Sequence, residues 1–163
     1  MLVLFLSCAG ISKAEQEQQM MPISKSEFAD KPFGFDLTLT NFEENYKGVL
    51  KRQRYFRTIH YTGNVDTIYS FYKGKKTKIL FYKYGRFEAR LMGGKIRKPK
   101  VELHNSIRTG LSRREFFAKF TDWHYDDSNI LTLDSPATRC TFTFVFSRSN
   151  KLKEIRFTVR QSN

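Results

Sequence analysis

The chain has 163 residues, a formal net charge of +13, an aromatic content of 15% and two cysteines. This length suits one domain, or two small lobes that share a core, and the cysteine count excludes a fold held together by several disulfides. The positive charge is concentrated, because the segment from Lys47 to Lys100 has sixteen Lys and Arg but only Asp66 and Glu88 as acids. Such a concentrated field attracts anionic partners.

The first residues have the character of a secretory signal. The run from Leu2 to Ile11 is apolar and uncharged, which is too short for a membrane-spanning helix but typical of a signal-peptide core. Small residues at Ser12 and Ala14 predict a cut that removes residues 1–14. The usual basic start is absent, which we interpret as a true start further upstream. The competing predictions are lipidation at Cys8, or an N-terminus that is simply buried or disordered.

These residues predict an exported protein, either periplasmic or extracellular, with a lipid-anchored outer-membrane form as the alternative. Cleavage would leave Cys140 as the one cysteine, expected to be a small buried hydrophobe. Residues 15–35 are rich in Gln and Glu and then in Pro and Ser, so they are expected to form a flexible polar tether. The folded part is then expected to be a single domain over residues 36–163.

The first half of this domain is expected to be a helix followed by a meander. Thr40 and Glu43 have the spacing of a capping box, which predicts a helix from Asn41 to about Lys47. Glycines at eleven-residue intervals then separate runs of aromatic and β-branched residues. Four antiparallel strands are expected, near Gln53–Tyr61, Asp66–Tyr72, Lys78–Tyr84 and Arg86–Met92. Residues 93–100 are expected to be a basic connector.

The second half begins with a stronger helix signal. Ser112 and Glu115 form a capping-box pattern, and Leu111 and Phe116 have the spacing of a hydrophobic staple. A strand is expected at Ile130–Leu133. A C-terminal hairpin should follow, because apolar residues alternate with polar ones in both of its strands. The inward positions are expected to be Cys140, Phe142, Phe144 and Phe146 in the first strand and Ile155, Phe157 and Val159 in the second.

Together these elements predict an α+β fold, an antiparallel β-sheet made of a meander and a C-terminal hairpin, with two short helices packed on one face. The segments 39–43 and 111–115 both read Leu-[Thr/Ser]-x-x-Glu, which favours tandem helix-plus-sheet units as a variant of this fold. The sub-repeats would then be 36–100 and 101–163.

Residues 107–160 resemble the β-lactamase-inhibitor-protein-like repeats that small outer-membrane assembly lipoproteins share. The similar features are the Ile-x-x-Gly-Leu-Ser approach to the helix, Glu115, and a hairpin with the phrase Asn-Lys-Leu-Lys-Glu-Ile at residues 150–155. The Gly-Pro that follows the helix in that family is absent here, where Thr121-Asp122-Trp123 stands. The resemblance implies an exported, non-enzymatic, protein-binding molecule, and it implies no functional residue.

Two surfaces are candidate binding sites. The first is a loop for protein contact, since Trp and Tyr supply much of the energy of interfaces; the alternative is that Trp123 only caps the core beside Phe120. Its residues are Trp123, His124, Tyr125, Asp126 and Asp127. The second is a set of basic residues among aromatic ones, which suits an anionic ligand. The alternative is that these bases only form a solvated face that keeps sheet edges from aggregating. Its residues are Lys51, Arg52, Arg54, Lys73, Lys75, Lys76, Lys78, Arg97 and Lys98.

Export makes nucleic acid an unexpected ligand and favours lipid headgroups, lipopolysaccharide phosphates or acidic glycans, with peripheral membrane contact as one form of binding. The leading hypothesis is a non-enzymatic binding protein that contacts another protein. The alternatives are a binder of anionic envelope lipid or polysaccharide through the 47–100 face, and a hydrolase with dispersed catalytic residues. No catalytic motif, metal-ligand spacing or cofactor motif is present, so no catalytic residue, metal or cofactor is predicted.

Overall fold

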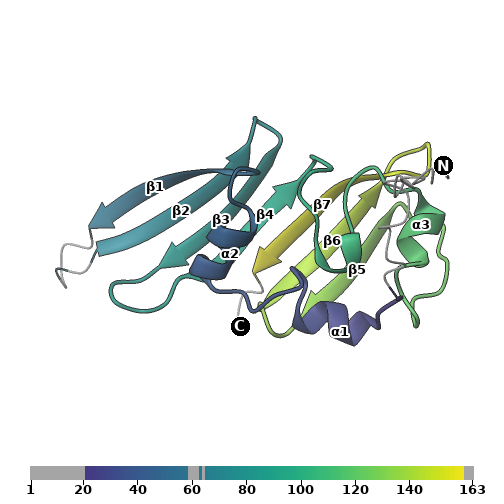
Figure 1. Ribbon diagram of the computed structural model, residues 1–163, viewed down its shortest axis with the longest axis horizontal. Coiled ribbons are helices and arrows are strands. Elements are labelled where there is room, and N and C mark those ends of the chain that lie inside the picture. The colour runs from purple at the N-terminus through teal and green to yellow at the C-terminus, as the bar shows by residue number, and fades with distance from the viewer. Residues whose placement is uncertain (1–20, 59–62, 64, 160–163) are drawn as a thin grey trace, which may run out of the picture.

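The computed structural model describes residues 21–58, 63 and 65–159, and these form one antiparallel sheet with short helices (Figure 1). The helical elements are α1 (Lys25–Asp30), α2 (Leu39–Asn45), α3 (Arg113–Phe117) and the 3-10 turn η1 (His104–Ser106). The strands are β1 (Lys51–Thr58), β2 (Val65–Lys73), β3 (Thr77–Lys83), β4 (Arg90–Ile96), β5 (Ile130–Ser135), β6 (Cys140–Phe146) and β7 (Leu152–Val159). The expected α+β class is confirmed.

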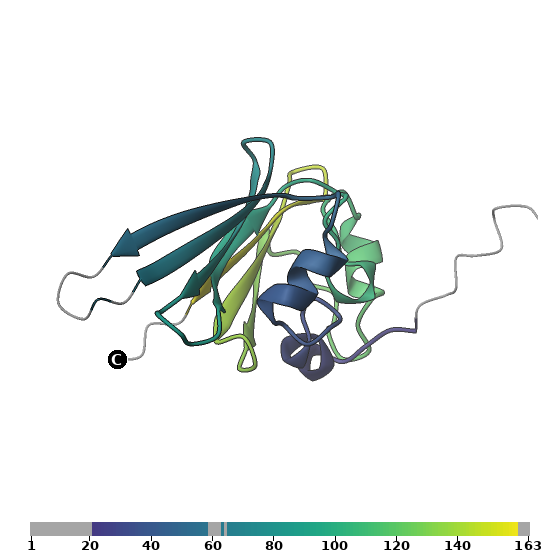
Figure 2. The ribbon, with the colours of Figure 1, turned by 60° about the vertical axis from the view of Figure 1, so that its left-hand side comes forward.

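The seven strands lie in the order β1-β2-β3-β4-β7-β6-β5, and every neighbouring pair is antiparallel. The meander of the first half and the three strands of the second half therefore join through β4 and β7. The helices all lie on one side of this sheet, as Figure 2 shows edge-on. We call the other side the open face. An antiparallel sheet tolerates such an arrangement because its strands alternate apolar and polar side chains.

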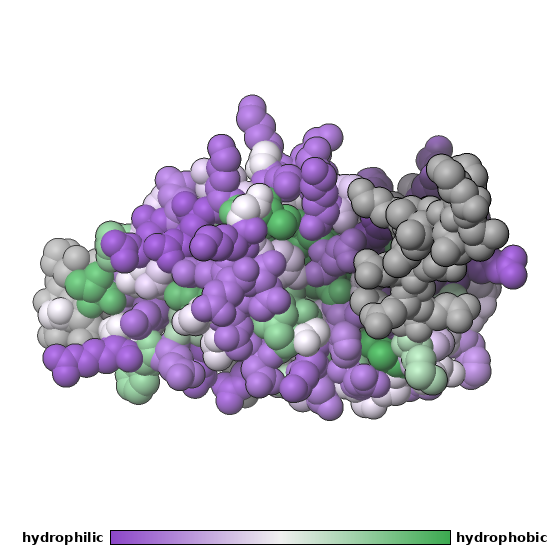
Figure 3. All heavy atoms as spheres, in the orientation of Figure 1, coloured by the Kyte–Doolittle hydropathy of each residue, from purple (hydrophilic) through white to green (hydrophobic). Residues whose placement is uncertain are grey.

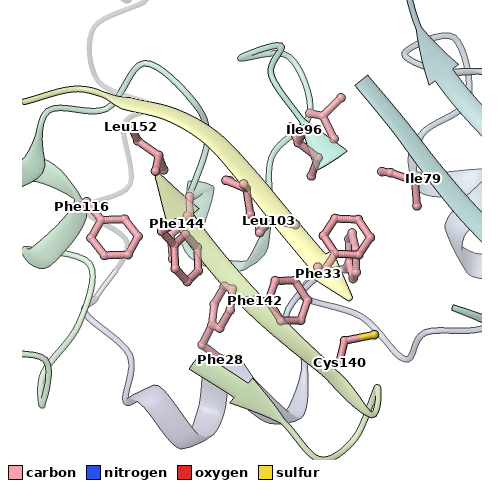
Figure 4. Close-up of a cluster of buried hydrophobic side chains, with 14 of the residues drawn as sticks. Phe28, Phe33, Ile79, Ile96, Leu103, Phe116, Cys140, Phe142, Phe144 and Leu152 are labelled. Atoms are coloured by element: carbon pink, nitrogen blue, oxygen red, sulfur yellow. The ribbon is translucent and has the colours of Figure 1, made fainter. Parts of the chain in front are cut away.

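Phenylalanine rings fill the space between helices and sheet (Figure 4). Cys140, Phe142, Phe144 and Phe146 are all buried, as the alternation predicts, and Ile155 and Phe157 follow the same pattern in β7. Val159, which was expected to point inward, is instead exposed at the last position of that strand.

The expectation of a flexible tether is wrong for residues 21–35. Ile23 pairs with Phe120 in a parallel bridge, and α1 buries Phe28 completely. The Phe28 ring lies 5.8 Å from that of Phe120 and 5.7 Å from that of Phe142. The missed signal is Ser24, whose side chain accepts a hydrogen bond from the Glu27 amide and so caps the helix inside a polar stretch. Residues 1–14, the proposed signal, and 15–20 lie outside the described residues.

The first predicted helix begins two residues earlier than expected, at Leu39, and has no capping box. Thr38, not Thr40, caps α2 by accepting from the Asn41 amide. Glu43 forms an ion pair with Arg52 of β1 instead of closing a box. The two Leu-[Thr/Ser]-x-x-Glu segments therefore hold different positions relative to their helices, which removes this pattern as support for a duplication.

The fourth strand was also misplaced. Residues 86–89 belong to the β3–β4 loop, and β4 runs from Arg90 through Gly93 and Gly94, which were expected to lie in a connector. A side chain at Gly94 cannot fit, because its Cβ would lie 2.5 Å from the Lys78 carbonyl oxygen and 2.8 Å from Cζ of Phe157. The two glycines thus allow β4 to pack closely between β3 and β7. The expectation that they break the strand and begin a connector is wrong.

The second capping box is confirmed. The Ser112 amide donates to Oε2 of Glu115 at 2.6 Å, and the Glu115 amide donates to Oγ of Ser112 at 3.2 Å. Phe116, Phe117 and Phe120 are buried beneath α3 as the sequence predicts. The helix is anchored to the hairpin by the Leu152 amide, which donates to the Leu111 carbonyl oxygen at 2.7 Å.

This box predicts a pH-dependent contribution to stability. Hydrogen bonds with Ser112 hold the pKa of the Glu115 carboxyl below its usual value of 4.5. A depressed pKa contributes stability above the unfolded-state pKa, and that stability is lost as pH falls through the folded-state pKa. We expect Glu115→Gln to reduce the free energy of unfolding by about 0.5 kcal/mol at pH 7 and by nearly nothing at pH 2.5. Urea unfolding at both pH values measures this, and an equal loss at both would contradict it.

Candidate binding site on the open face

A hollow of about 790 Å³ lies on the open face, over β3, β4 and β7, and reaches the β5–β6 loop. Its apolar lining includes Leu80, Met92 and Val159, of which Met92 is 47% exposed. Cationic side chains also line it, from all four of these segments. They are Lys78, Arg90, Lys95, Arg139 and Arg156. No Asp or Glu is among the described residues that line it.

Strand register places three of these cations side by side. Lys78 of β3 is the direct partner of Lys95 of β4, and Lys95 is the direct partner of Arg156 of β7. We call these three residues the basic row. Directly opposed side chains of an antiparallel pair are close neighbours, and like charges there destabilise a sheet. The basic row therefore lowers the stability of the sheet and creates a strong local attraction for an anion.

One buried acid lies beside this row, two residues before Arg156 on the same side of β7. Glu154 is 1% exposed, and its two carboxylate oxygens accept from Nε of Arg97 and Nε of Arg156. An ion pair to a buried carboxylate holds an arginine side chain in one position. Less conformational entropy is then lost when that arginine binds a ligand. Glu154 thus orients Arg156 while leaving Lys78 and Lys95 without an ion-pair partner among the described residues.

The hollow owes its depth to an irregularity in β4. The register of β3 and β4 shifts so that Leu80 faces Gly93 while Phe81 faces Leu91, which leaves Met92 as an extra, bulged residue. Gly93, with φ of 145°, adds no side chain to the lining, and a Cβ there would lie 2.9 Å from the Phe157 carbonyl oxygen. The missing side chain leaves open space between Leu80 and Thr158.

The structure disperses the predicted anionic-ligand residues. Lys78 lines the hollow, whereas Arg97 does not line it and pairs with Glu154, the same carboxylate that Arg156 contacts. Arg52 and Arg54 point to the opposite face, where Arg52 pairs with Glu43 and Arg54 lies over the Phe56 ring. The remaining predicted residues lie in β1, in or beside the β2–β3 turn, or after β4, and do not line the hollow. They are Lys51, Lys73, Lys75, Lys76 and Lys98.

Sequence reasoning missed Arg90, Lys95, Arg139 and Arg156. The alternation in β7 does place Arg156 on the polar side of its strand. The sequence does not reveal that β7 pairs with β4, because the two strands are 55 residues apart in the chain. That pairing alone brings Arg156 beside Lys95.

Trp123, the expected anchor of a protein contact, packs against the core. Its ring centroid lies 4.9 Å from that of Phe120 and 5.5 Å from that of Phe116, and the side chain is half-buried. The alternative interpretation, a cap on the core, therefore fits its position. His124, Asp126 and Asp127 are exposed, and Tyr125 is exposed beside Phe117 at 5.4 Å.

The loop that holds Trp123 is fixed by a buried arginine. Nη1 of Arg113 donates to the carbonyl oxygens of Asp126 and Ser128, at 2.8 and 2.5 Å, and Nη2 donates to Oδ1 of Asn129. The guanidinium also lies 4.4 Å from the Phe146 ring centroid. These contacts satisfy a charge that is 2% exposed, so the loop is a structural part of the fold.

The described residues offer little support for a reactive cysteine, a metal site or a membrane-spanning helix. Burial raises the pKa of the Cys140 thiol, which disfavours the reactive thiolate. No three His, Cys, Asp or Glu side chains of the described part are placed to hold a metal ion. His60 lies outside the described residues, His104 is partly buried and His124 is exposed. Among the described helices, none has the length and apolar character needed to span a membrane.

Comparison of the chain with protein-family models, with curated proteins and with solved structures finds no match. The resemblance to β-lactamase-inhibitor-protein-like repeats therefore stays a prediction from the sequence. The candidate function depends on the geometry of the open face.

Proposed function

We propose that the protein binds an anionic amphiphile, a lipid with a phosphate or carboxylate headgroup, in the hollow of the open face. The observation that carries this proposal is the position of the basic row beside an apolar lining. A headgroup at Lys78, Lys95 and Arg156 would place an attached hydrocarbon chain over Leu80 and Met92. The volume of the hollow, about 790 Å³, is of the size that small-molecule sites commonly have.

The apolar lining favours a lipid over a polysaccharide. A polyanionic glycan needs an extended basic surface with polar contacts, whereas Leu80, Met92 and Val159 offer hydrocarbon. The sequence favoured protein contact through Trp123, but a half-buried tryptophan that packs on Phe116 and Phe120 offers little free surface. We therefore rank lipid binding above protein contact. The proposed activity is non-enzymatic, and an exported location remains part of the proposal.

Calorimetric titration with dodecyl phosphate, below the concentration at which it forms micelles, tests this function. We expect dodecyl phosphate to bind at least tenfold more tightly than inorganic phosphate, which lacks the chain, and than dodecyl maltoside, which lacks the charge. Raising the salt concentration should weaken the binding of dodecyl phosphate much more than that of the maltoside.

Three results would contradict the proposal. If inorganic phosphate binds as tightly as dodecyl phosphate, the apolar lining contributes nothing. If heparin binds and displaces dodecyl phosphate at comparable charge concentration, the site is one for acidic glycans, as the alternative from the sequence holds. A titration with no heat or saturation for dodecyl phosphate removes the function altogether.

A further inference from the structure

The exposed hydrophobic residues gather at one end of the sheet. Because all strand pairs are antiparallel, β1, β3 and β7 end where β2 and β4 begin. Of the ten large hydrophobic side chains that are exposed in the described part of the chain, six lie at this end. We call it the aromatic end; its residues are Tyr55, Phe56, Val65, Tyr84, Phe87 and Val159.

Two phenylalanines stand out in exposure. Phe87 is 70% exposed, and Phe56 is 62% exposed. Phe87 lies in the β3–β4 loop, where its amide donates to the Tyr84 carbonyl oxygen at 3.0 Å and its ring stacks on that of Tyr84 at a centroid distance of 6.0 Å. In the orientation of Figure 3 hydrophilic residues cover most of the visible face, while hydrophobic ones reach the surface where β1 ends and β2 begins.

Cations accompany these aromatic residues. Basic side chains at the aromatic end outnumber the exposed acids there, Glu88 and Asp134. The bases are Arg54, Lys83, Arg86, Arg90 and Arg139. The Arg54 guanidinium lies 4.5 Å from the Phe56 ring centroid. Aromatic rings flanked by Lys and Arg fit the boundary of an anionic bilayer, where rings sit at headgroup depth and cations meet anionic lipid.

The opposite end of the sheet has a different character. It presents the β2–β3 turn with Lys75 and Lys76, and the segment after β4 with Lys98, all exposed. Only one large hydrophobic strand residue is exposed there, Ile130 at the start of β5. Charge alone therefore does not distinguish the two ends, whereas exposed aromatic area does.

We infer that the aromatic end docks on an anionic lipid bilayer, with Phe56 and Phe87 entering the headgroup region. The hollow reaches this same end, because Arg90 and Val159 belong to both surfaces. Docking would thus bring the hollow to the level of the lipids. The inference goes beyond the proposed function and does not require it, since a bilayer can bind the aromatic end while the hollow is empty.

Co-sedimentation with large vesicles tests the docking. We expect the protein to bind vesicles of phosphatidylglycerol and phosphatidylcholine and to bind pure phosphatidylcholine at least tenfold more weakly. Phe56→Ser combined with Phe87→Ser should reduce binding to the anionic vesicles by about tenfold or more, because the rings no longer enter the interface. Tyr125→Ser combined with Ile130→Ser is the matched control, with side chains 58% and 59% exposed away from this end, and should stay within twofold of wild type.

Thermal unfolding of both double variants checks that the fold is intact, which is expected because all four side chains are exposed. If the Phe56→Ser/Phe87→Ser variant binds vesicles as tightly as wild type, or if the control variant loses as much binding, the inference is overturned. The aromatic end would then be a surface for another partner, such as a protein. Titration of the same variants with dodecyl phosphate separates the two proposals. Failure of vesicle binding with intact dodecyl phosphate binding contradicts docking alone.

Discussion

Replacing both Lys78 and Lys95 with Glu should weaken dodecyl phosphate binding by at least about a hundredfold. Each replacement removes an attraction to the headgroup and adds a repulsion, and at the effective dielectric of a partly enclosed site each charge is worth on the order of 1 kcal/mol or more. The two side chains are exposed, and the directly opposed pair stays like-charged after the change. The stability of the sheet should therefore change little while the sign of the field reverses.

Lys47→Glu combined with Arg114→Glu is the control for this prediction. It makes the same change in net charge on two exposed side chains, one just after α2 and one in α3, on the side of the sheet opposite the open face. We expect less than a threefold change in affinity for it at physiological ionic strength, because distant exposed charges are screened. Calorimetric titration compares the two variants. Equal losses would mean that overall charge, and not the basic row, attracts the ligand.

Phe28→Ala should reduce the free energy of unfolding by about 3–5 kcal/mol. The side chain is fully buried, and its ring contacts those of Phe120, Phe142 and Phe144 at 5.7 to 5.9 Å. Truncation removes this apolar area and leaves a cavity between α1 and the sheet. A loss of this size would be a large fraction of the stability of a typical domain.

Phe87→Ala is the matched control, since it removes the same side chain from a position that is 70% exposed. We expect its effect on the free energy of unfolding to stay within about 0.5 kcal/mol. Urea unfolding followed by circular dichroism measures both. If Phe28→Ala costs less than about 1 kcal/mol, the segment 21–35 does not pack on the sheet and the tether interpretation stands.

Local patterns in the sequence predicted the second half of the fold well. Alternation along β6, and the Ser112–Glu115 spacing before α3, report on contacts within one element or one hairpin. The first half was predicted less well, because its features depend on distant partners. Phe28 is a core residue because it packs on Phe120 and Phe142, which lie about ninety residues or more after it in the sequence.

The candidate site was harder to predict for the same reason. Lys78 was singled out within a run of bases, yet its importance comes from Lys95 and Arg156 on neighbouring strands. Gly93 and Gly94 resembled a connector, because the sequence does not show that a backbone passes within 3 Å of a Cβ at Gly94. Sheet order and register, which no local pattern encodes, are what assemble the site.

The most direct test of lipid binding on the open face is amide NMR of the labelled protein titrated with dodecyl phosphate. The proposal predicts that the largest shift changes fall on the amides of Gly93, Gly94 and Thr158, which line the hollow, and that the amides of Trp123 and Tyr125 stay in place. Shift changes concentrated at Trp123 and Tyr125, with the glycine amides unmoved, would contradict lipid binding in the hollow. They would indicate the loop after α3 as the binding site.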